Sequence, residues 1–354
     1  MQKKIIALAI AGLASTAAFA QTNVTIYGIA DAAVLGTTYM GNPAKQTQFN
    51  VNSGVLSTSR IGFKGVEDLG NGLKALFVLE YGLTIDDNTG VGAGSAMGRQ
   101  QFVGLTGGFG TAVAGRLQTT GLDFAVAATA LGGSTGLGAY HNAGGGTLIT
   151  SATRANNAVA YISPSFGGVT VAYNHARMTE CAGTASTAAG VCDGAAATTG
   201  KTGETDNTAN LLSVSYANGP ITAGAIYTKF AVSSTAANDS IKEWGLRAGY
   251  DFSVVKLQAV YQQQKNEATA AVGKDKKWAV SLSAPIGAKV AVIAEYAALN
   301  IGSVAGEDNV KVGTLATTYA LSKRTTAYAG VVAKRSQVLN SDQNTYGLGL
   351  RHMF

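Results

Sequence analysis

Apolar residues recur at every second position in many short segments of the chain. In residues 73–82, Phe77 and Leu79 share one face of an extended strand, while Lys74 and Glu80 fall on the other. The same alternation marks residues 243–250, 255–263, 276–284 and 288–296. A period of two is typical of a β-strand with one apolar face. No apolar run after residue 20 approaches the roughly 20 residues of a membrane helix, so the pattern predicts an all-β chain.

Turn signals divide these strands in a regular rhythm. Short turn clusters fall at seven places: 68–72, 107–110, 164–168, 218–220, 250–254, 284–289 and 320–324. Eight longer polar or Gly/Ala-rich connections alternate with them: about 34–55, 85–98, 117–153, 178–207, 231–240, 266–275, 299–308 and 336–343. Seven short and eight long connections join sixteen strands. This layout predicts a 16-stranded antiparallel transmembrane β-barrel with short periplasmic turns and long external loops. An even strand count lets the first strand pair with the last and leaves no free edge.

The composition agrees with an exported membrane barrel. Charged residues are only 13% of the chain, against about 25% in typical soluble proteins. Lys3 and Lys4 precede the apolar segment 5–14, and Ala18-Phe19-Ala20 offers a small-residue cleavage site. Residues 1–20 are therefore predicted to be a cleaved signal peptide for Sec export, and residues 21–354 the barrel domain. Cleavage reduces the net charge from +6 to about +4. This dispersed charge does not predict nucleic-acid binding, which usually needs a clustered basic patch.

The face of each strand sorts the charged residues. In a membrane barrel the lipid side takes the apolar set and the lumen takes the polar set. This rule places ten cations in the lumen if Arg99 is included: Arg60, Lys64, Lys74, Arg99, Arg116, Arg154, Arg247, Lys256, Lys277 and Lys289. It places four carboxylates there: Asp31, Glu80, Glu243 and Glu295. Arg99 shares its parity with apolar Val103 and Leu105, so the alternation does not show which face of this strand meets lipid. A shift of one residue in register would reverse which residues are assigned to the lumen.

An excess of lumenal Arg and Lys predicts attraction of anions, because low-dielectric walls strengthen the field inside a channel. The alternative is that these cations form ion pairs that brace the wall. Arg116 opposes Val113 and Leu117 by parity, so those two apolar residues are expected to face lipid.

Motifs of catalysis and metal binding are weak in this chain. GGSTG at 132–136 matches the nucleophile pattern G-x-S-x-G but lacks the strand before it and the helix after it. His141, His175 and His352 are scattered without metal-ligand spacing. We therefore expect no enzyme activity, metal or cofactor. Cys181 and Cys192 form an even pair in an exported chain, which predicts a disulfide that closes the connection 178–207.

The C-terminal segment 345–354, TYGLGLRHMF, alternates to its last residue. Tyr346, Leu348, Leu350 and Phe354 form a row that is expected to face lipid, with His352 as the polar exception. Chain ends usually fray, so a pattern that continues to Phe354 predicts a closing strand paired with the segment 24–34.

Several segments together resemble the general porins of Gram-negative bacteria, in particular the group found in β-proteobacteria. The segments that carry the resemblance are VTIYGIADAAV (24–34), SRIGFKGVEDLGNGLKALFVLEYG (59–82), GRQQFVGLTGGFGTAVAGR (98–116), RANNAVAYISPSFGGVTVAY (154–173), ALSKRTTAYAG (320–330) and the terminal GLRHMF.

The resemblance implies a homotrimer in the outer membrane that passes small anionic or neutral solutes. It implies that the third external loop, about 117–153, folds inward to form the constriction. Arg60, Arg99 and Arg154 match wall arginines of anion-selective relatives, and Glu80 matches an acidic wall position. Asp123 is the only carboxylate before Arg154 in the third loop, so the transverse field should be weaker than in many relatives. Phe354 is expected to be the recognition signal for the barrel-insertion machinery.

The predicted function is a passive, water-filled diffusion channel surrounded by outer-membrane lipids, with a preference for anions. The pore-constriction candidates are Arg60, Arg99, Arg154, Glu80, Arg116, Lys64, Lys74 and Asp123. One alternative is a channel specific for a single class of organic acids or phosphate. Another is a surface adhesin or receptor that binds through the loops 117–153 and 178–207.

Overall fold

The computed structural model describes residues 24–40, 47–87, 89–90, 98–144, 154–181, 205–233, 238–267, 273–302, 308–337 and 342–354. The predicted signal peptide therefore lies outside the described residues, and so does Cys192. Cys181 ends a strand, but its side chain is outside the description, and the disulfide stays a prediction.

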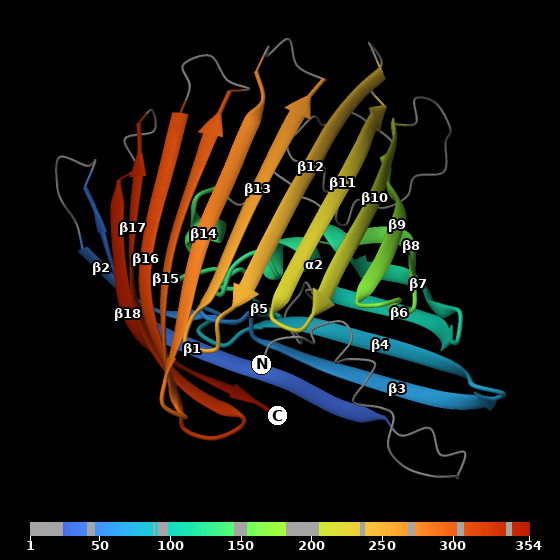
Figure 1. Ribbon diagram of the computed structural model, residues 1–354, viewed down its shortest axis with the longest axis horizontal. Coiled ribbons are helices and arrows are strands. Elements are labelled where there is room, and N and C mark those ends of the chain that lie inside the picture. Colours follow the sequence, from blue (N-terminus) through green and yellow to red (C-terminus); the bar gives the residue numbers. More distant parts are fainter. Residues whose placement is uncertain are drawn as a thin grey trace.

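Most of the described chain is extended strand (Figure 1). The strands are β1 (Thr25–Tyr39), β2 (Thr47–Ser53), β3 (Arg60–Gly70), β4 (Leu73–Thr84), β5 (Thr89–Gly90), β6 (Gly98–Gly107), β7 (Gly110–Gln118), β8 (Arg154–Ile162), β9 (Val169–Cys181), β10 (Thr205–Asn218), β11 (Ile221–Ser233), β12 (Asn238–Asp251), β13 (Lys256–Asn266), β14 (Asp275–Ile286), β15 (Val290–Ile301), β16 (Asp308–Ala320), β17 (Thr325–Ser336) and β18 (Gln343–Met353). Two short helices, α2 (Thr120–Val126) and α3 (Ala139–Asn142), follow β7. Neither of these described helices is long and apolar enough to cross a membrane.

The strands close into a 16-stranded antiparallel barrel, as the alternation predicted. Two strands of the wall are interrupted. β2 and β3 pair with successive parts of β1, and β5 and β6 pair with successive parts of β4. Counted as one strand each, these pairs reduce the labelled strands to sixteen. β1 pairs with β18 from Ile29 opposite Met353 to Tyr39 opposite Gln343, which closes the barrel.

All seven predicted short turns are confirmed, since a strand ends and the next begins at each of them. The eight long connections are also found, but two are much shorter than predicted. Most of the range 231–240 is strand, because β11 continues to Ser233 and β12 begins at Asn238. β1 continues to Tyr39 and β2 begins at Thr47, so most of the range 34–55 is strand. The Gly, Thr and Asn residues there are compatible with extended pairing once β1 supplies the partner strand, which composition alone cannot reveal.

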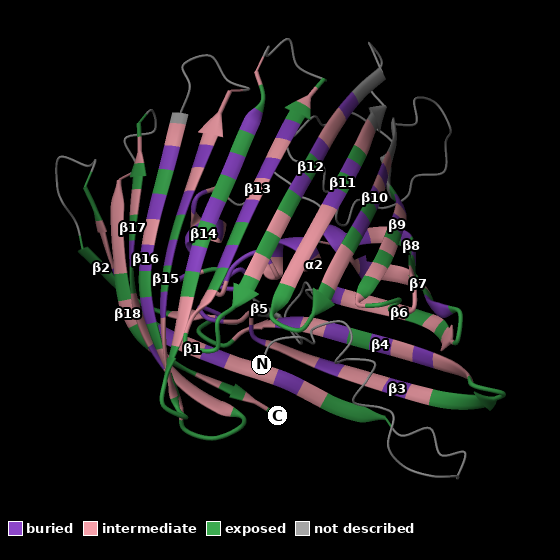
Figure 2. Cartoon of the chain, viewed as in Figure 1, coloured by how far each residue is buried: buried purple, intermediate pink, exposed green. Residues whose placement is uncertain are grey.

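Burial alternates along the strands, and the exposed rows are the apolar ones (Figure 2). Ile26 on β1, Val103 on β6 and Leu246 on β12 are each more than half exposed in the isolated chain. Their partners in the alternation point into the lumen. The lipid-facing rows therefore follow the predicted parity in most strands, including Leu348 and Leu350 on β18.

The lumenal face departs from the rule that it is polar. On β11 to β17, many inward positions carry buried apolar side chains, among them Ile226, Val260, Ile293, Val312 and Val332. They pack against apolar residues of the segment that follows β7. The assignment for β7 was wrong: Ala112 and Ala114 are exposed, whereas Leu117 is 2% exposed and packs against lumenal alanines of β8 and β9. An apolar residue can face the lumen wherever another part of the chain covers it.

The chain is held to its last residue. Gly28 and Phe354 exchange two backbone hydrogen bonds, of 3.0 and 3.1 Å. The Phe354 ring lies directly over Gly28, where an added Cβ would be 2.3 Å from the ring atom Cζ. Gly28 is therefore required for the terminal aromatic to close against β1.

Candidate functional site

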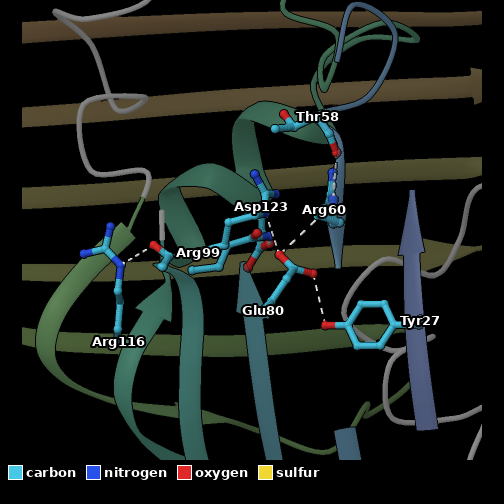
Figure 3. A network of polar contacts seen from close by, with 9 residues as sticks. Tyr27, Thr58, Arg60, Glu80, Arg99, Arg116 and Asp123 are labelled. Carbon is cyan, nitrogen blue, oxygen red and sulfur yellow. Dashed lines mark hydrogen bonds and ion pairs between the residues drawn. The ribbon is translucent and has the colours of Figure 1, made fainter. Parts of the chain in front are cut away.

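The buried carboxylate of Glu80 on β4 is the centre of a cluster of charges on the barrel wall (Figure 3). Arg99 on β6 donates from Nε to Glu80 Oε1 at 2.6 Å, and Arg60 at the start of β3 lies 3.9 Å from the same oxygen. The Tyr27 hydroxyl on β1 donates to the other oxygen, Oε2, at 3.0 Å. Charge-assisted hydrogen bonds of this kind fix side chains in one geometry.

A β-bulge turns Arg99 into the lumen. The register between β4 and β6 shifts by one residue, because Leu79 opposes Gln101 whereas Tyr81 opposes Gly98. The extra residue of β6 reverses the parity of the strand at this point. Arg99 therefore reaches Glu80 although it shares its parity with the lipid-facing Val103. The bulge explains why the sequence alone could not show whether Arg99 faces the lumen or the lipid.

Arg154 and Arg116 add positive charge beside this cluster. Arg154 begins β8 and interacts electrostatically with Arg60, Arg99 and Arg116 as well as with Glu80. Arg116 on β7 is directed elsewhere in Figure 3, and its Nε donates to the Gly98 carbonyl at 2.7 Å. It also donates to the side chain of Asn156. The four arginines come from β3, β6, β7 and β8, which together with β4, the strand of Glu80, are five consecutive strands of the wall.

The two predicted lysines are placed differently from the arginines. Lys64 on β3 lies over the Tyr27 ring, with its Nζ 5.2 Å from the ring centroid. Lys74 lies six residues from Glu80 along β4, opposite Asp68 at the turn end of the strand. At about 3.4 Å per residue, that separation is about 20 Å, so Lys74 is not brought into the cluster. Its placement there was wrong, because parity fixes the face of a residue and not its depth.

Opposite the arginines, residues 119–144 run through the inside of the barrel, and we call them the inner loop. Its helix α2 is drawn within the barrel in Figure 1. Thr119 caps α2 by accepting a hydrogen bond from the Leu122 amide. Glu295 on β15 accepts from the backbone amides of Leu131 at 2.7 Å and Ala139 at 3.0 Å. The inner loop is therefore fixed to the inner face of the wall.

A second anchor of the inner loop comes from the break between β2 and β3. Residues 54–59 leave the wall there, and the Val55 carbonyl accepts hydrogen bonds from the Ser134 hydroxyl at 2.7 Å and the Gly136 amide at 3.1 Å. Buried Asp31 accepts in turn from the Ser57 amide at 2.7 Å and the Tyr328 hydroxyl. The inner loop is thus held from both sides of the lumen.

The inner loop also has its own apolar core. Phe124, Leu131, Leu137 and Tyr140 are buried against the lumenal apolar residues of β11 to β17. Burial of one such side chain is worth about 1.5–3 kcal/mol. This packing fills part of the barrel with protein and leaves the arginines on the wall facing the remaining space.

Asp123 is the acidic group of the inner loop. Its Oδ1 accepts a hydrogen bond of 2.6 Å from Gln118, and Arg154 and Arg247 act on it electrostatically. Burial raises the pKa of Asp123 to about 7, and the hydrogen bond and the two arginines oppose that rise. Arg247 lies over the Phe124 ring, 5.7 Å from its centroid. The carboxyl therefore titrates near neutral pH between two guanidinium groups.

Sequence reasoning missed three parts of this arrangement. Tyr27 shares the inward parity of Asp31, and this signal could have identified it as a wall residue. Gln118 gave no signal, because its bond to Asp123, five residues on, depends on the path of the inner loop. The segment 54–59 gave none either, because its role depends on contacts with a segment far along the chain.

Comparison with known proteins gives consistent matches over nearly the whole chain. The family model described as "Gram-negative porin" matches residues 7–339. Outer membrane porin protein 32 of Delftia acidovorans is 31% identical, over 100% of this chain and 94% of the relative. An outer membrane porin protein of Bordetella pertussis is 28% identical, over 100% of both chains. The solved structure of the anion-selective porin from Comamonas acidovorans superposes with a TM-score of 0.76 at 26% identity, covering 94% of this chain and 100% of that one.

Proposed function

The chain belongs to the family of Gram-negative porins, and on this premise we propose that it is an outer-membrane diffusion channel whose arginine-lined constriction prefers anions. The space between the inner loop and the arginine cluster is the narrowest part of the route. Small anionic and neutral solutes pass through it by diffusion, without chemistry.

The observation that carries the anion preference is the imbalance of charge around Glu80. Arg60 and Arg99 contact the carboxylate of Glu80, Arg154 interacts with it electrostatically, and burial raises the pKa of Asp123 to about 7. The alternative, that the cations brace the wall by ion pairing, accounts for Arg99, which holds Glu80 at 2.6 Å, but not for Arg60 and Arg154. The surplus positive charge is available to passing ions.

Arg60 is the residue best placed to meet an anion. Its side chain is 22% exposed and lies 3.9 Å from Glu80, whereas the side chain of Arg99 is 11% exposed. Its Nε is held by the Thr58 carbonyl at 2.9 Å, which leaves the rest of the guanidinium to offer hydrogen bonds. Several such weak sites in series replace part of an anion's hydration shell and still let it leave.

Membership of the porin family also suggests how the protein is exported and assembled. We propose that the barrel is a homotrimer, that residues 1–20 are removed on export, and that Phe354 is read by the insertion machinery. The exposed Phe354 side chain and its fixed backbone support the last point.

The test of function is planar-bilayer recording of the purified, folded protein in a salt gradient. An anion-selective current that rises in groups of three supports the channel and the trimer together. Cation selectivity would refute the charge assignment, and conductance in single steps would refute the trimer alone.

A further inference from the structure

A row of lysines crosses the lipid-facing surface near the loop end of the barrel. Lys229 on β11 lies directly opposite Lys242 on β12, and Lys242 lies directly opposite Lys265 on β13. Lys276 on β14 is the next cation, one diagonal step further, opposite Gln263. All four side chains share the outward parity of their strands. We call these four residues the lysine row.

Such a row is unfavourable in isolation. Residues directly opposite in an antiparallel pair have their Cβ atoms about 4.5–5.5 Å apart, and like charges at such positions destabilise the sheet. Among the described residues, Glu267 is the carboxylate that reaches the row, 2.9 Å from Lys242 and 3.3 Å from Lys265. These hydrogen bonds, with one from Ser240, hold the pKa of Glu267 at about 2, so it stays ionised. In the part of the chain that the structure describes, one carboxylate therefore contacts a row of three directly opposed lysines.

The position of the row along the strands sets its depth in the membrane. Tyr227 lies two residues from Lys229 on β11, Trp244 two residues from Lys242 on β12, and Trp278 two residues from Lys276 on β14. Each aromatic residue lies about 7 Å from its lysine along the strand, in the direction of the short turns. Trp and Tyr side chains mark the boundary between hydrocarbon and headgroups. The lysines are therefore at the height of the headgroups, on the side with the long connections, which is the external leaflet.

We propose that the lysine row binds the phosphate groups of anionic lipid headgroups in the external leaflet. The phosphate oxygens supply the negative charge that three opposed lysines lack, and the row faces sideways into the membrane rather than into the pore. The surface is too cationic to be apposed to the same row of a second copy. The site is distinct from the arginine cluster and does not depend on the ion preference of the channel.

The experiment uses the full-length folded protein in a neutral detergent and bisphosphorylated lipid A as the probe. Native mass spectrometry counts the lipid molecules retained at increasing lipid concentration. The variant Lys229→Gln/Lys242→Gln/Lys265→Gln is compared with a control that removes three exposed cations at the turn end, Lys289→Gln/Lys323→Gln/Arg324→Gln. Lys289 was predicted to be lumenal but lies in the exposed turn between β14 and β15.

The row variant should need at least about tenfold more lipid for the same retention, because each lysine contributes to attraction of an anionic surface. The control should stay within about twofold of the natural protein. Glu267→Gln should bind more tightly than the natural protein, because it removes the competing carboxylate; this variant keeps all the lysines and is a second test if the triple variant folds poorly.

Equal retention by the row variant and the natural protein would overturn the proposal. Retention of dephosphorylated lipid A as strongly as of the bisphosphorylated form would do the same, since phosphate recognition is the claim. A row variant that retains lipid normally but changes oligomeric state would assign this surface to a protein contact instead.

Discussion

Replacing Arg60 or Arg99 by Gln separates the two roles that an arginine can have at this constriction. Both side chains contact Glu80, but at different distances and exposures. The side chain of Arg99 is 11% exposed and holds the carboxylate at 2.6 Å, whereas Arg60 is further from the carboxylate and more exposed to the lumen. Arg99→Gln should therefore lower stability, and Arg60→Gln should lower anion preference.

The magnitudes follow from the geometry. Removing one partner of a buried ion pair costs about 3–5 kcal/mol, because it leaves the other charge buried without its counter-ion. Arg99→Gln should therefore lower the free energy of unfolding by that amount. The contact of Arg60 with Glu80 is 3.9 Å long and partly exposed, so it contributes about 1 kcal/mol or less to stability. A unit charge about 4 Å from a passing anion contributes about 1 kcal/mol in bulk water. In a water-filled pore, Arg60→Gln should therefore reduce the anion-to-cation permeability ratio roughly fivefold.

Two assays check this pair of variants. Reversal potentials in a KCl gradient give the permeability ratio, and thermal unfolding followed by circular dichroism gives the stability. A change in the permeability ratio below about twofold for Arg60→Gln would refute the reasoning, because even the dielectric constant of bulk water predicts a larger change. Unchanged unfolding of Arg99→Gln would show that Glu80 does not depend on that arginine.

Three other predictions address the inner loop and barrel closure. Because the raised pKa of Asp123 is about 7, its carboxyl gains a proton as pH falls through 7, so the anion-to-cation ratio should rise on acidification. Asp123→Asn should abolish that pH dependence, and a persistent titration near pH 7 would assign it to another group. Glu295→Ala removes the acceptor of two loop amides, a loss of about 1.5–3 kcal/mol for each bond to a charged group. Noisier and larger single-channel currents should result, and a quiet, unchanged current would contradict the anchoring role. Gly28→Leu should reduce the yield of folded barrel, and deletion of Phe354 should reduce the yield of folded trimer more than the conductance of any barrel that forms, because Gly28 lies against the terminal ring. Heat-modifiable mobility on gels measures the folded fraction, and normal yield of either variant would argue against this closure.

The barrel itself was predictable because its rules act locally. Alternation and turn residues repeat within each hairpin, so each of the seven short turns could be found without knowledge of the rest of the chain. Closure followed from the even count and from the unbroken pattern up to Phe354.

The constriction was less predictable because it depends on irregularities and on long-range contacts. Parity cannot detect the bulge that turns Arg99 inward, and resemblance alone identified this residue. Parity also misread Leu117, which is apolar yet buried, because it packs against alanines of the neighbouring strands β8 and β9. The anchors of the inner loop, Glu295 and Val55, lie far along the chain from the groups they bind. The sequence separation is 164 positions for Glu295 and Leu131 and 79 positions for Val55 and Ser134.

Anion preference is the central claim, and the reversal potential of the natural protein in a KCl gradient tests it most directly. The surplus of arginine around Glu80 predicts a potential whose sign reports chloride as the more permeant ion, and a smaller potential in Arg60→Gln. A potential of the opposite sign, with potassium as the more permeant ion, would contradict the account.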